Sequence, residues 1–174
     1  MANVLPPADV IALLTVYQAR FTLILRRHGG VIDKFLGDCI LASFGAAERS
    51  EIYAQDACAV LWAFMDESAR WAAKRQATGL PPIQVIGAAA GGRFIYGAVC
   101  DSDRLEMTMI SDAVNFVVKL EKHARTEARR ALVSLDRYAL AERQGFQPAG
   151  LVEHLPARAV EGVSRPIDLV ALSA

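Results

Sequence analysis

Apolar residues recur at helical spacing near the start of the chain. Val10, Leu14, Tyr17, Phe21 and Ile24 lie three or four residues apart, which predicts a helix with one apolar face. Two prolines precede this stretch and two glycines follow it, as is usual at the two ends of a helix. The pattern therefore predicts a first helix that packs along one side.

Short apolar runs alternate with helical patterns along the rest of the chain. Two runs, Val31–Phe35 and Cys39–Phe44, flank a Gly37-Asp38 corner and predict a β-hairpin. The later predicted elements are a helix from about Ser50 to Arg75, a buried strand over Ile83–Ala90, a second hairpin over Phe94–Val99 and Met107–Ile110, a helix from Ser111 or Asp112 to about Arg125, a strand over Ala131–Ser134, a short helix over Leu135–Arg143, and strands near Leu151–His154 and Ile167–Leu172. This order predicts an α+β fold, with helices packed on one face of a mainly antiparallel sheet.

Composition indicates a folded chain without a charge bias. Hydrophobic residues make up 53% of the 174 residues, enough for the core of one domain, predicted over 1–174. Lys plus Arg and Asp plus Glu are both 19, which argues against a nonspecific nucleic-acid binder. The longest apolar run, Ala57–Met65, is too short to span a bilayer, and the three cysteines lie far apart without metal-ligand spacing. We expect a cytoplasmic domain with no nucleic-acid or membrane contact, whether or not a parent protein is membrane-anchored.

The first segment with candidate chemistry is residues 28–38, HGGVIDKFLGD. A carboxylate at a hairpin corner, here Asp38, is well placed to hold a hard cation such as Mg²⁺. Gly-Asp is also good turn chemistry, and Lys34 has the similar alternative of a solvated strand lysine. Spacing alone favours these structural interpretations.

Two further segments follow. Residues 104–115, RLEMTMISDAVN, lead a strand into a helix N-terminus, whose N–H groups and dipole suit phosphate. A plain helix cap at Ser111 or Asp112 explains the same pattern. Residues 160–169, VEGVSRPIDL, by themselves predict only a turn followed by a strand.

In this order, the three segments resemble the catalytic domain of class III adenylate and guanylate cyclases. The first is similar to the family's HGG-x-[VI]-DK-[FY]-[IL]-GD hairpin, and the second to its R-x-[DE]-x-T-x-I-[GS]-D-x-VN strand-to-helix junction. The third is similar to the closing strand of the family, and the resemblance extends from about Leu5 to Leu172. The resemblance implies a ferredoxin-like cyclase homology domain.

The resemblance also implies a reaction. Family members form head-to-tail dimers with active sites at the interface, so a second cyclase domain is an expected partner, in a homodimer or a heterodimer. The 3′-hydroxyl of ATP attacks the α-phosphate, which gives cyclic AMP and releases pyrophosphate. Two divalent ions, Mg²⁺ or Mn²⁺, activate the attacking and leaving oxygens.

Five residues of this chain match functional positions of the family. Asp38 matches the second of two metal-binding aspartates, and Asn115 matches the residue that orients the ribose. Lys34 and Thr108 match the pair that recognises adenine, where a lysine donates to a ring nitrogen and a hydroxyl engages the exocyclic amine. Lys119 falls at the position of the transition-state arginine.

The sequence departs from the family pattern in three places. The strand with the first metal aspartate is expected to lie before Met1, so we expect an N-terminally incomplete domain with the first strand missing. Lys119 keeps the charge of the arginine but loses its planar fork. Glu161 falls at the position of the triphosphate lysine, where it repels the ligand unless Arg158 or Arg165 substitutes.

These departures leave three hypotheses. The chain is part of an adenylate cyclase, inactive or weakly active on its own, because loss of one charge stabiliser typically costs about 10²–10³ in rate. Alternatively, it is a non-catalytic cyclase-like domain that dimerises or senses nucleotide. A third possibility is a domain that is active only with a complete partner.

Overall fold

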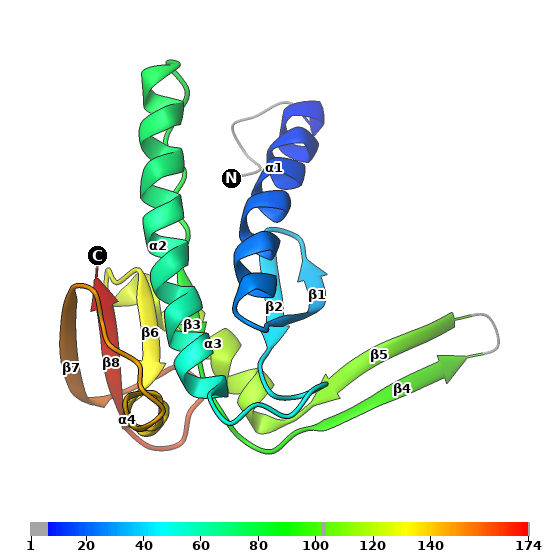
Figure 1. Ribbon diagram of the computed structural model, residues 1–174, viewed down its shortest axis with the longest axis vertical. Coiled ribbons are helices and arrows are strands. Elements are labelled where there is room, and N and C mark those ends of the chain that lie inside the picture. Colours follow the sequence, from blue (N-terminus) through cyan, green and yellow to red (C-terminus); the bar gives the residue numbers. More distant parts are fainter. Residues whose placement is uncertain (1–6, 102–103, 174) are drawn as a thin grey trace.

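The computed structural model describes residues 7–101 and 104–173 (Figure 1). Its elements are α1 (Pro7–Arg27), β1 (Val31–Leu36), β2 (Cys39–Ser43), α2 (Tyr53–Ala77), β3 (Gly87–Ala89), β4 (Ile95–Asp101), β5 (Arg104–Ile110), α3 (Asp112–Thr126), β6 (Ala131–Ser134), α4 (Leu135–Arg143), β7 (Leu151–Arg158) and β8 (Ile167–Ser173). The order of elements predicted from the sequence is confirmed, and α1 is the first element of the described part.

The end of α1 follows from the two glycines after it. Gly29 adopts a φ of 70°, which favours glycine, and the N–H of Gly30 donates to the carbonyl of Leu25 at 2.9 Å. Gly30 also leaves room for Phe44, because a Cβ there would lie 2.9 Å from the Phe44 ring. The glycines therefore cap the helix and turn the chain into β1.

A four-stranded sheet is the centre of the fold. Its order is β3-β6-β8-β7, with β3 parallel to β6 and the other neighbours antiparallel. The hairpins β1–β2 and β4–β5 form two separate two-stranded sheets. The prediction of mainly antiparallel pairing is confirmed.

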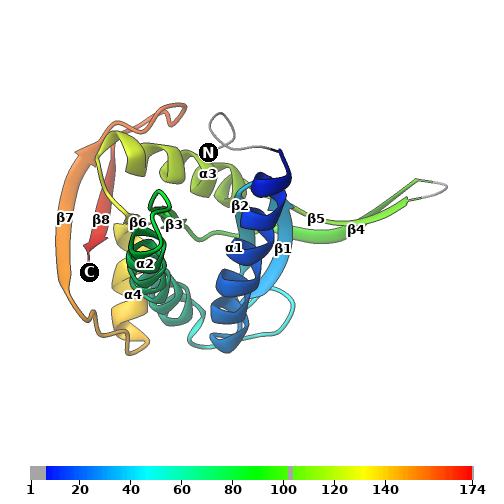
Figure 2. The ribbon, with the colours of Figure 1, turned by 90° about the horizontal axis from the view of Figure 1, so that it is seen from above.

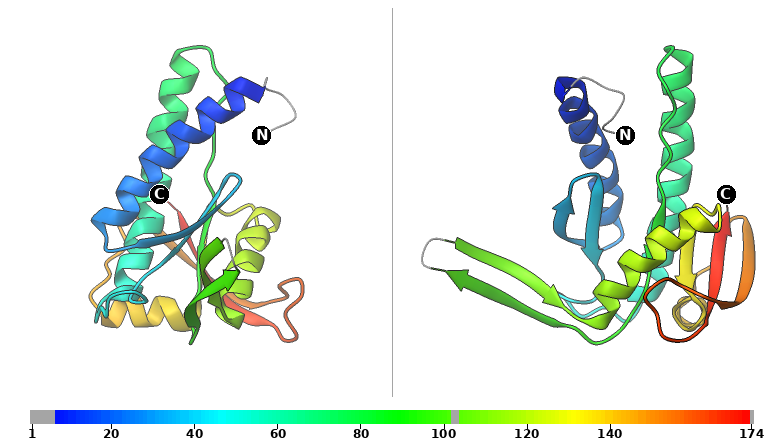
Figure 3. Two further views of the ribbon diagram at one scale, coloured as in Figure 1. Left: turned by 90° about the vertical axis from the view of Figure 1, so that its right-hand side faces the viewer. Right: turned by 180° about the vertical axis from the view of Figure 1, so that it is seen from behind.

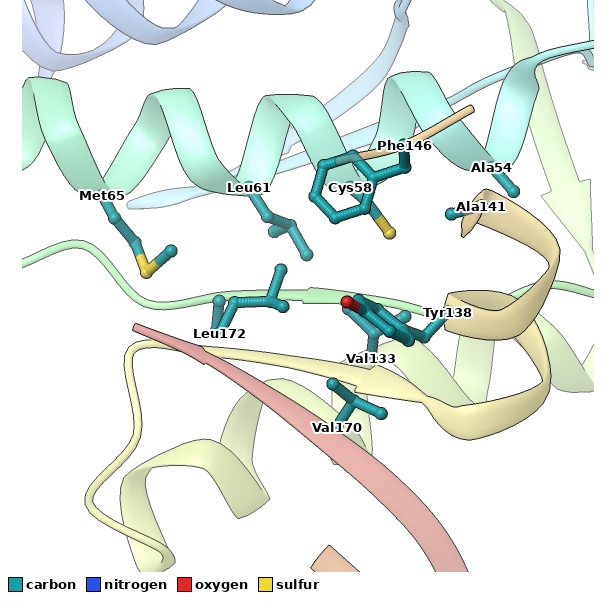
Figure 4. Close-up of a cluster of buried hydrophobic side chains, with 11 residues drawn as sticks. Ala54, Cys58, Leu61, Met65, Val133, Tyr138, Ala141, Phe146, Val170 and Leu172 are labelled. Carbon is teal, nitrogen blue, oxygen red and sulfur yellow. The ribbon is translucent and has the colours of Figure 1, made fainter. Parts of the chain in front are cut away.

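Helices cover both faces of this sheet, so the prediction that they lie on one face is wrong. Side chains alternate along a strand. Val133 and Val170 face α2 and α4, in the cluster drawn in Figure 4, whereas Leu132 and Ala171 pack with α3. Figure 2 shows the sheet between α3 and the pair α2 and α4. Both faces of the central strands are apolar, so both need a cover.

Only residues 87–89 of the predicted strand Ile83–Ala90 pair in the sheet, so its predicted length is corrected. The preceding residues run along α2, where Ile83 and Val85 are buried without strand partners. The Ser68 hydroxyl accepts from the N–H of Val85 at 3.1 Å and donates to the Ile83 carbonyl at 3.4 Å. An apolar run indicates burial, and here a helix provides it.

A second cluster holds α1 against α2. Phe21 is fully buried, and its ring centre lies 4.8 Å from that of Phe64 in an edge-on contact. Beside it, Arg20 Nη1 lies 2.7 Å from Glu67 Oε1. This cluster places α1 and the β1–β2 hairpin on the opposite side of α2 from β7 and β8, while β4–β5 extends away from the body (Figures 1 and 3).

Among the described helices, α1 alone has the length and composition to cross a membrane. Its stretch Ala8–Arg27 has a mean hydropathy of 1.5, with 17% of the window buried. Helices in protein cores pass the same test, and Tyr17, Phe21 and Leu25 of α1 pack inside this protein. Length and composition do not by themselves assign a membrane to α1.

Truncating Leu132 tests the two-sided core. Leu132 is fully buried beneath α3, so Leu132→Ala is expected to lower the free energy of unfolding by about 2–5 kcal/mol. Leu151 is 77% exposed, and Leu151→Ala is expected to change it by less than about 0.5 kcal/mol. Urea unfolding measures both, and equal losses would contradict this core.

Candidate functional site

The β1–β2 hairpin carries Lys34 and Asp38. Gly37, with a φ of 63°, and Asp38 form the turn, and Asp38 is exposed. The pairing register shifts between Ile32 and Lys34, so Asp33 is a bulged residue and Lys34 pairs with Leu41. A bulge changes the direction of the side chains that follow it, so the hairpin orients Lys34 differently from a regular strand.

Asp33 was quoted in the motif but not assigned a role from the sequence. Its Oδ1 accepts from the Ser43 hydroxyl at 3.3 Å, whereas Oδ2 is buried with no hydrogen-bond partner among the described atoms. Burial raises the pKa of this carboxyl, although the Ser43 hydrogen bond opposes the shift. The hairpin therefore contains a half-buried carboxylate directly before Lys34.

The junction between β5 and α3 has a capped helix start. Ser111 Oγ accepts from the N–H of Ala113 at 2.8 Å and of Val114 at 3.4 Å, which confirms the predicted cap. Two N–H groups of this helix end are therefore already satisfied. Thr108 lies on β5 opposite Gly97, and β5 contacts β1; the Thr108 side chain falls outside the described part.

A groove of about 580 Å³, here called the central groove, runs between the two halves of the molecule. Its walls are β2, residues 84–92, one side of α2 and one side of α3. From α3 it is lined by Ala113, Val114, Val117, Val118, Glu121 and Arg125, and at the hairpin end by Asp38. Most of the remaining lining is apolar.

Asn115 and Lys119 lie on another side of α3. At 100° per residue they share one side, which is turned away from that of Val114, Val117 and Glu121. Asn115 is exposed, and Lys119 Nζ donates to the Gly162 carbonyl at 2.5 Å. One chain therefore places Asp38 on the groove side of α3, and Asn115 with Lys119 on a different side.

Negative charges gather around the hairpin end of the central groove. The pKa of Tyr17, from α1, is raised above its usual value, mainly by burial and then by the charges of Cys39, Asp38 and Glu121. Sequence reasoning did not single out Glu121, although its helical spacing from Val114, Val117 and Val118 indicated a shared side.

The described donors do not form a two-metal site. Within residues 7–101 and 104–173, no three His, Cys, Asp or Glu side chains gather closely enough to hold an ion. Glu121 is engaged by Arg125 at 2.7 Å. One exposed carboxylate, Asp38, is too few for two ions about 4 Å apart, so no reaction step is assigned to metal in one chain.

The expected phosphate position carries a negative charge. Glu161 is exposed in the turn between β7 and β8. Of the two candidate replacements, Arg158 lies 3.3 Å from Glu127, and Arg165 is exposed nearby. Because Arg158 is already paired, Arg165 and Lys119 are the cations of this region left to consider for a phosphate.

Comparisons of sequence agree with the motifs. No protein-family model matches the chain. An uncharacterised Mycobacterium tuberculosis protein is 34% identical over 131 residues, or 75% of this chain and 23% of its own length. Adenylate cyclase 1 of Rhizobium meliloti is 29% identical over 115 residues, 66% of this chain and 17% of its own. The chain thus spans about a quarter or less of these curated relatives.

Comparisons of structure agree over nearly the whole chain. The adenylyl cyclase CyaB from P. aeruginosa has a TM-score of 0.83 at 23% identity, covering 99% of this chain and 86% of its own. The guanylyl cyclase Cya2 has a TM-score of 0.78 at 22% identity, covering 98% and 83%. Fold and ordered motifs together identify the chain as a cyclase homology domain, the catalytic domain type of class III nucleotide cyclases.

Replacing Asp33 tests the half-buried carboxylate. Because its pKa is raised in the folded protein, the folded state binds the proton more tightly, so stability falls as pH rises from the ordinary carboxyl range through the raised pKa. Asp33→Asn keeps an acceptor for Ser43 and removes this fall. We expect its Tm to exceed that of the unmodified protein at pH 7 and to approach it near pH 3.

The exposed Asp9 provides the control. Asp9→Asn is expected to leave the difference in Tm between pH 3 and pH 7 nearly unchanged in scanning calorimetry. A pH dependence that Asp33→Asn leaves intact would contradict the assignment.

Proposed function

We propose that this chain is an adenine-nucleotide-binding cyclase domain that works in a dimer, where conversion of ATP to cyclic AMP and pyrophosphate needs a second domain. The division of the candidate residues between two sides of α3 carries this proposal. Asp38 lies at the groove, whereas Asn115 and Lys119 lie on another side of the helix, so one chain does not surround a nucleotide with all three. Two copies, or a copy and a related domain, bring one group from each chain to a shared site.

Adenine preference rests on Lys34 and Thr108. Their strands, β1 and β5, contact each other, which supports a common purine site. Both adenylyl and guanylyl cyclases are among the similar structures, so the fold does not choose the base. The choice is therefore assigned to these two side chains.

The chain by itself is proposed to have little or no cyclase activity. Its described residues offer one carboxylate, Asp38, toward a hard cation, and the metal pair requires more than one. Lys119 is held by the Gly162 carbonyl, and Glu161 adds negative charge beside it. A partner domain that supplies further metal ligands is thus part of the proposal.

A non-catalytic role in dimerisation or nucleotide sensing is the second candidate. Two observations favour it: the hydrogen bond that engages Lys119, and the exposed Glu161 where the family has a phosphate-binding lysine. Both weaken stabilisation of a transition state while leaving purine binding intact. Product formation separates the two candidates.

A mixing experiment tests the shared site. Asp38→Ala and Asn115→Ala are each expected to abolish ATP binding, measured by equilibrium dialysis with Mn²⁺. Mixed in equal amounts, they form heterodimers with one intact site, and binding returns to about a quarter of the unmodified capacity. Two Asp38→Ala samples mixed together provide the control, and no recovery in the mixture would refute a site shared between chains.

A charge reversal tests the base preference. Lys34→Glu is expected to weaken ATP binding at least about tenfold and to reduce the preference over GTP, because a hydrogen bond to a charged group is lost. Lys74→Glu makes the same charge change at an exposed site on α2 and is expected to leave both affinities unchanged. Equal effects of the two variants would show a nonspecific charge effect.

Mass spectrometry of cyclic AMP tests catalysis. With ATP and Mn²⁺, the chain alone is expected to give no product above that of Asp38→Ala. Product that appears on addition of a complete cyclase domain, and needs Asn115 of this chain, supports the enzyme. ATP binding without product in any mixture would favour the non-catalytic role.

A further inference from the structure

The central groove has four walls of two kinds. Two are strand edges: β2 pairs only with β1, and β3 pairs only with β6, within the described residues. The other two are helix sides, from α2 and α3, which cover opposite faces of the sheet. All of β2 and all of β3 line the groove, so their free edges border one common space.

Unpaired strand edges determine what fits there. Each edge presents a row of N–H and C=O groups, and burying them without partners is costly. A lipid tail or an apolar small molecule satisfies none of these groups. A polypeptide in extended conformation offers donors and acceptors along both of its edges at the spacing of a strand ladder.

The helix walls determine the side chains of such a segment. Ala57, Cys58 and Leu61 face the space from α2, and Val114 and Val117 face it from α3. Successive side chains of a strand point to opposite faces, so both sets of side chains meet apolar walls. A strand buried on both faces has a nearly continuous apolar sequence, typically of β-branched residues.

Length and charge narrow the occupant further. β2 has five residues, or roughly 17 Å of strand, which sets the length of the ladder. The charged residues of the lining are Asp38, Glu121, Arg125 and Arg137, and the rest of the walls is uncharged. A segment of five or six uncharged residues fits these limits.

We propose that the central groove binds an extended, uncharged, mainly β-branched segment of five or six residues as an added strand between β2 and β3. The described strands already have partners, so the segment comes from polypeptide outside the described residues, and the curated relatives, of which the chain spans 23%, are long enough to hold one. The added strand joins the β1–β2 hairpin and the four-stranded sheet into one continuous sheet. This binding does not depend on nucleotide.

Hydrogen exchange with a synthetic peptide tests the proposal. The probe is an eight-residue peptide with a Val- and Ala-based core of six residues and a lysine at each end. At millimolar concentration and without nucleotide, it is expected to slow amide exchange at least tenfold in both Cys39–Ser43 and Gly87–Ala89. The same peptide, N-methylated at alternate residues, cannot complete a ladder and is expected to protect neither strand.

A blocking variant gives an independent measurement. Ala57 lines the groove from α2, so Ala57→Trp is expected to fill the space and abolish peptide protection. Ala73 lies exposed on the same helix, and Ala73→Trp is expected to leave protection unchanged. Circular dichroism shows whether each variant is folded, and the N-methylated peptide tests the unmodified protein if Ala57→Trp is not.

Several results would overturn the proposal. Protection absent from either strand would do so, as would equal protection by the N-methylated peptide or by a nonionic detergent, which would mark an apolar ligand groove instead. Protection that appears without peptide and rises with protein concentration would assign the groove to a second copy of the chain. None of these results bears on ATP binding, which the mixing experiment measures separately.

Discussion

Burial of both faces of β6 and β8 is the constraint on which the rest of this structure depends. Leu132, Val133, Val170 and Ala171 are at most 1% exposed, and they alternate between the two sides of the sheet. Two apolar faces require two covers, so α2 and α4 lie on one side and α3 on the other. The positions of α2 and α3 then set the width and the walls of the central groove.

The position of α3 also decides how the candidate site is divided. The helix packs on the sheet through Leu120 and Ala124, which leaves its other sides free. One of these lines the groove near Asp38, and another carries Asn115 and Lys119. A helix presents different residues on different sides, so a site that uses both needs a second chain. Dimerisation is thus a geometric requirement of the proposed function.

The weak points of the proposed chemistry are electrostatic. Lys119 donates to a backbone carbonyl, Glu161 adds negative charge near the expected phosphates, and Asp38 lacks the companions of a metal cluster in the described chain. None of these features prevents purine recognition by Lys34 and Thr108. The same chain therefore suits binding of ATP better than unaided conversion of ATP.

The sequence by itself determined the order of elements, the caps at Gly29 and Ser111, and the family resemblance, because these depend on local spacing and on contiguous motifs. Only the tertiary structure decided which face each helix covers, that most of Ile83–Ala90 packs along α2 instead of pairing, and that Asp33 is a half-buried bulge. It also decided that Asp38 and Asn115 lie on different sides of α3. Apolar periodicity specifies that a side is buried, but the partner that buries it is distant in sequence, and distances between distant residues are set by packing.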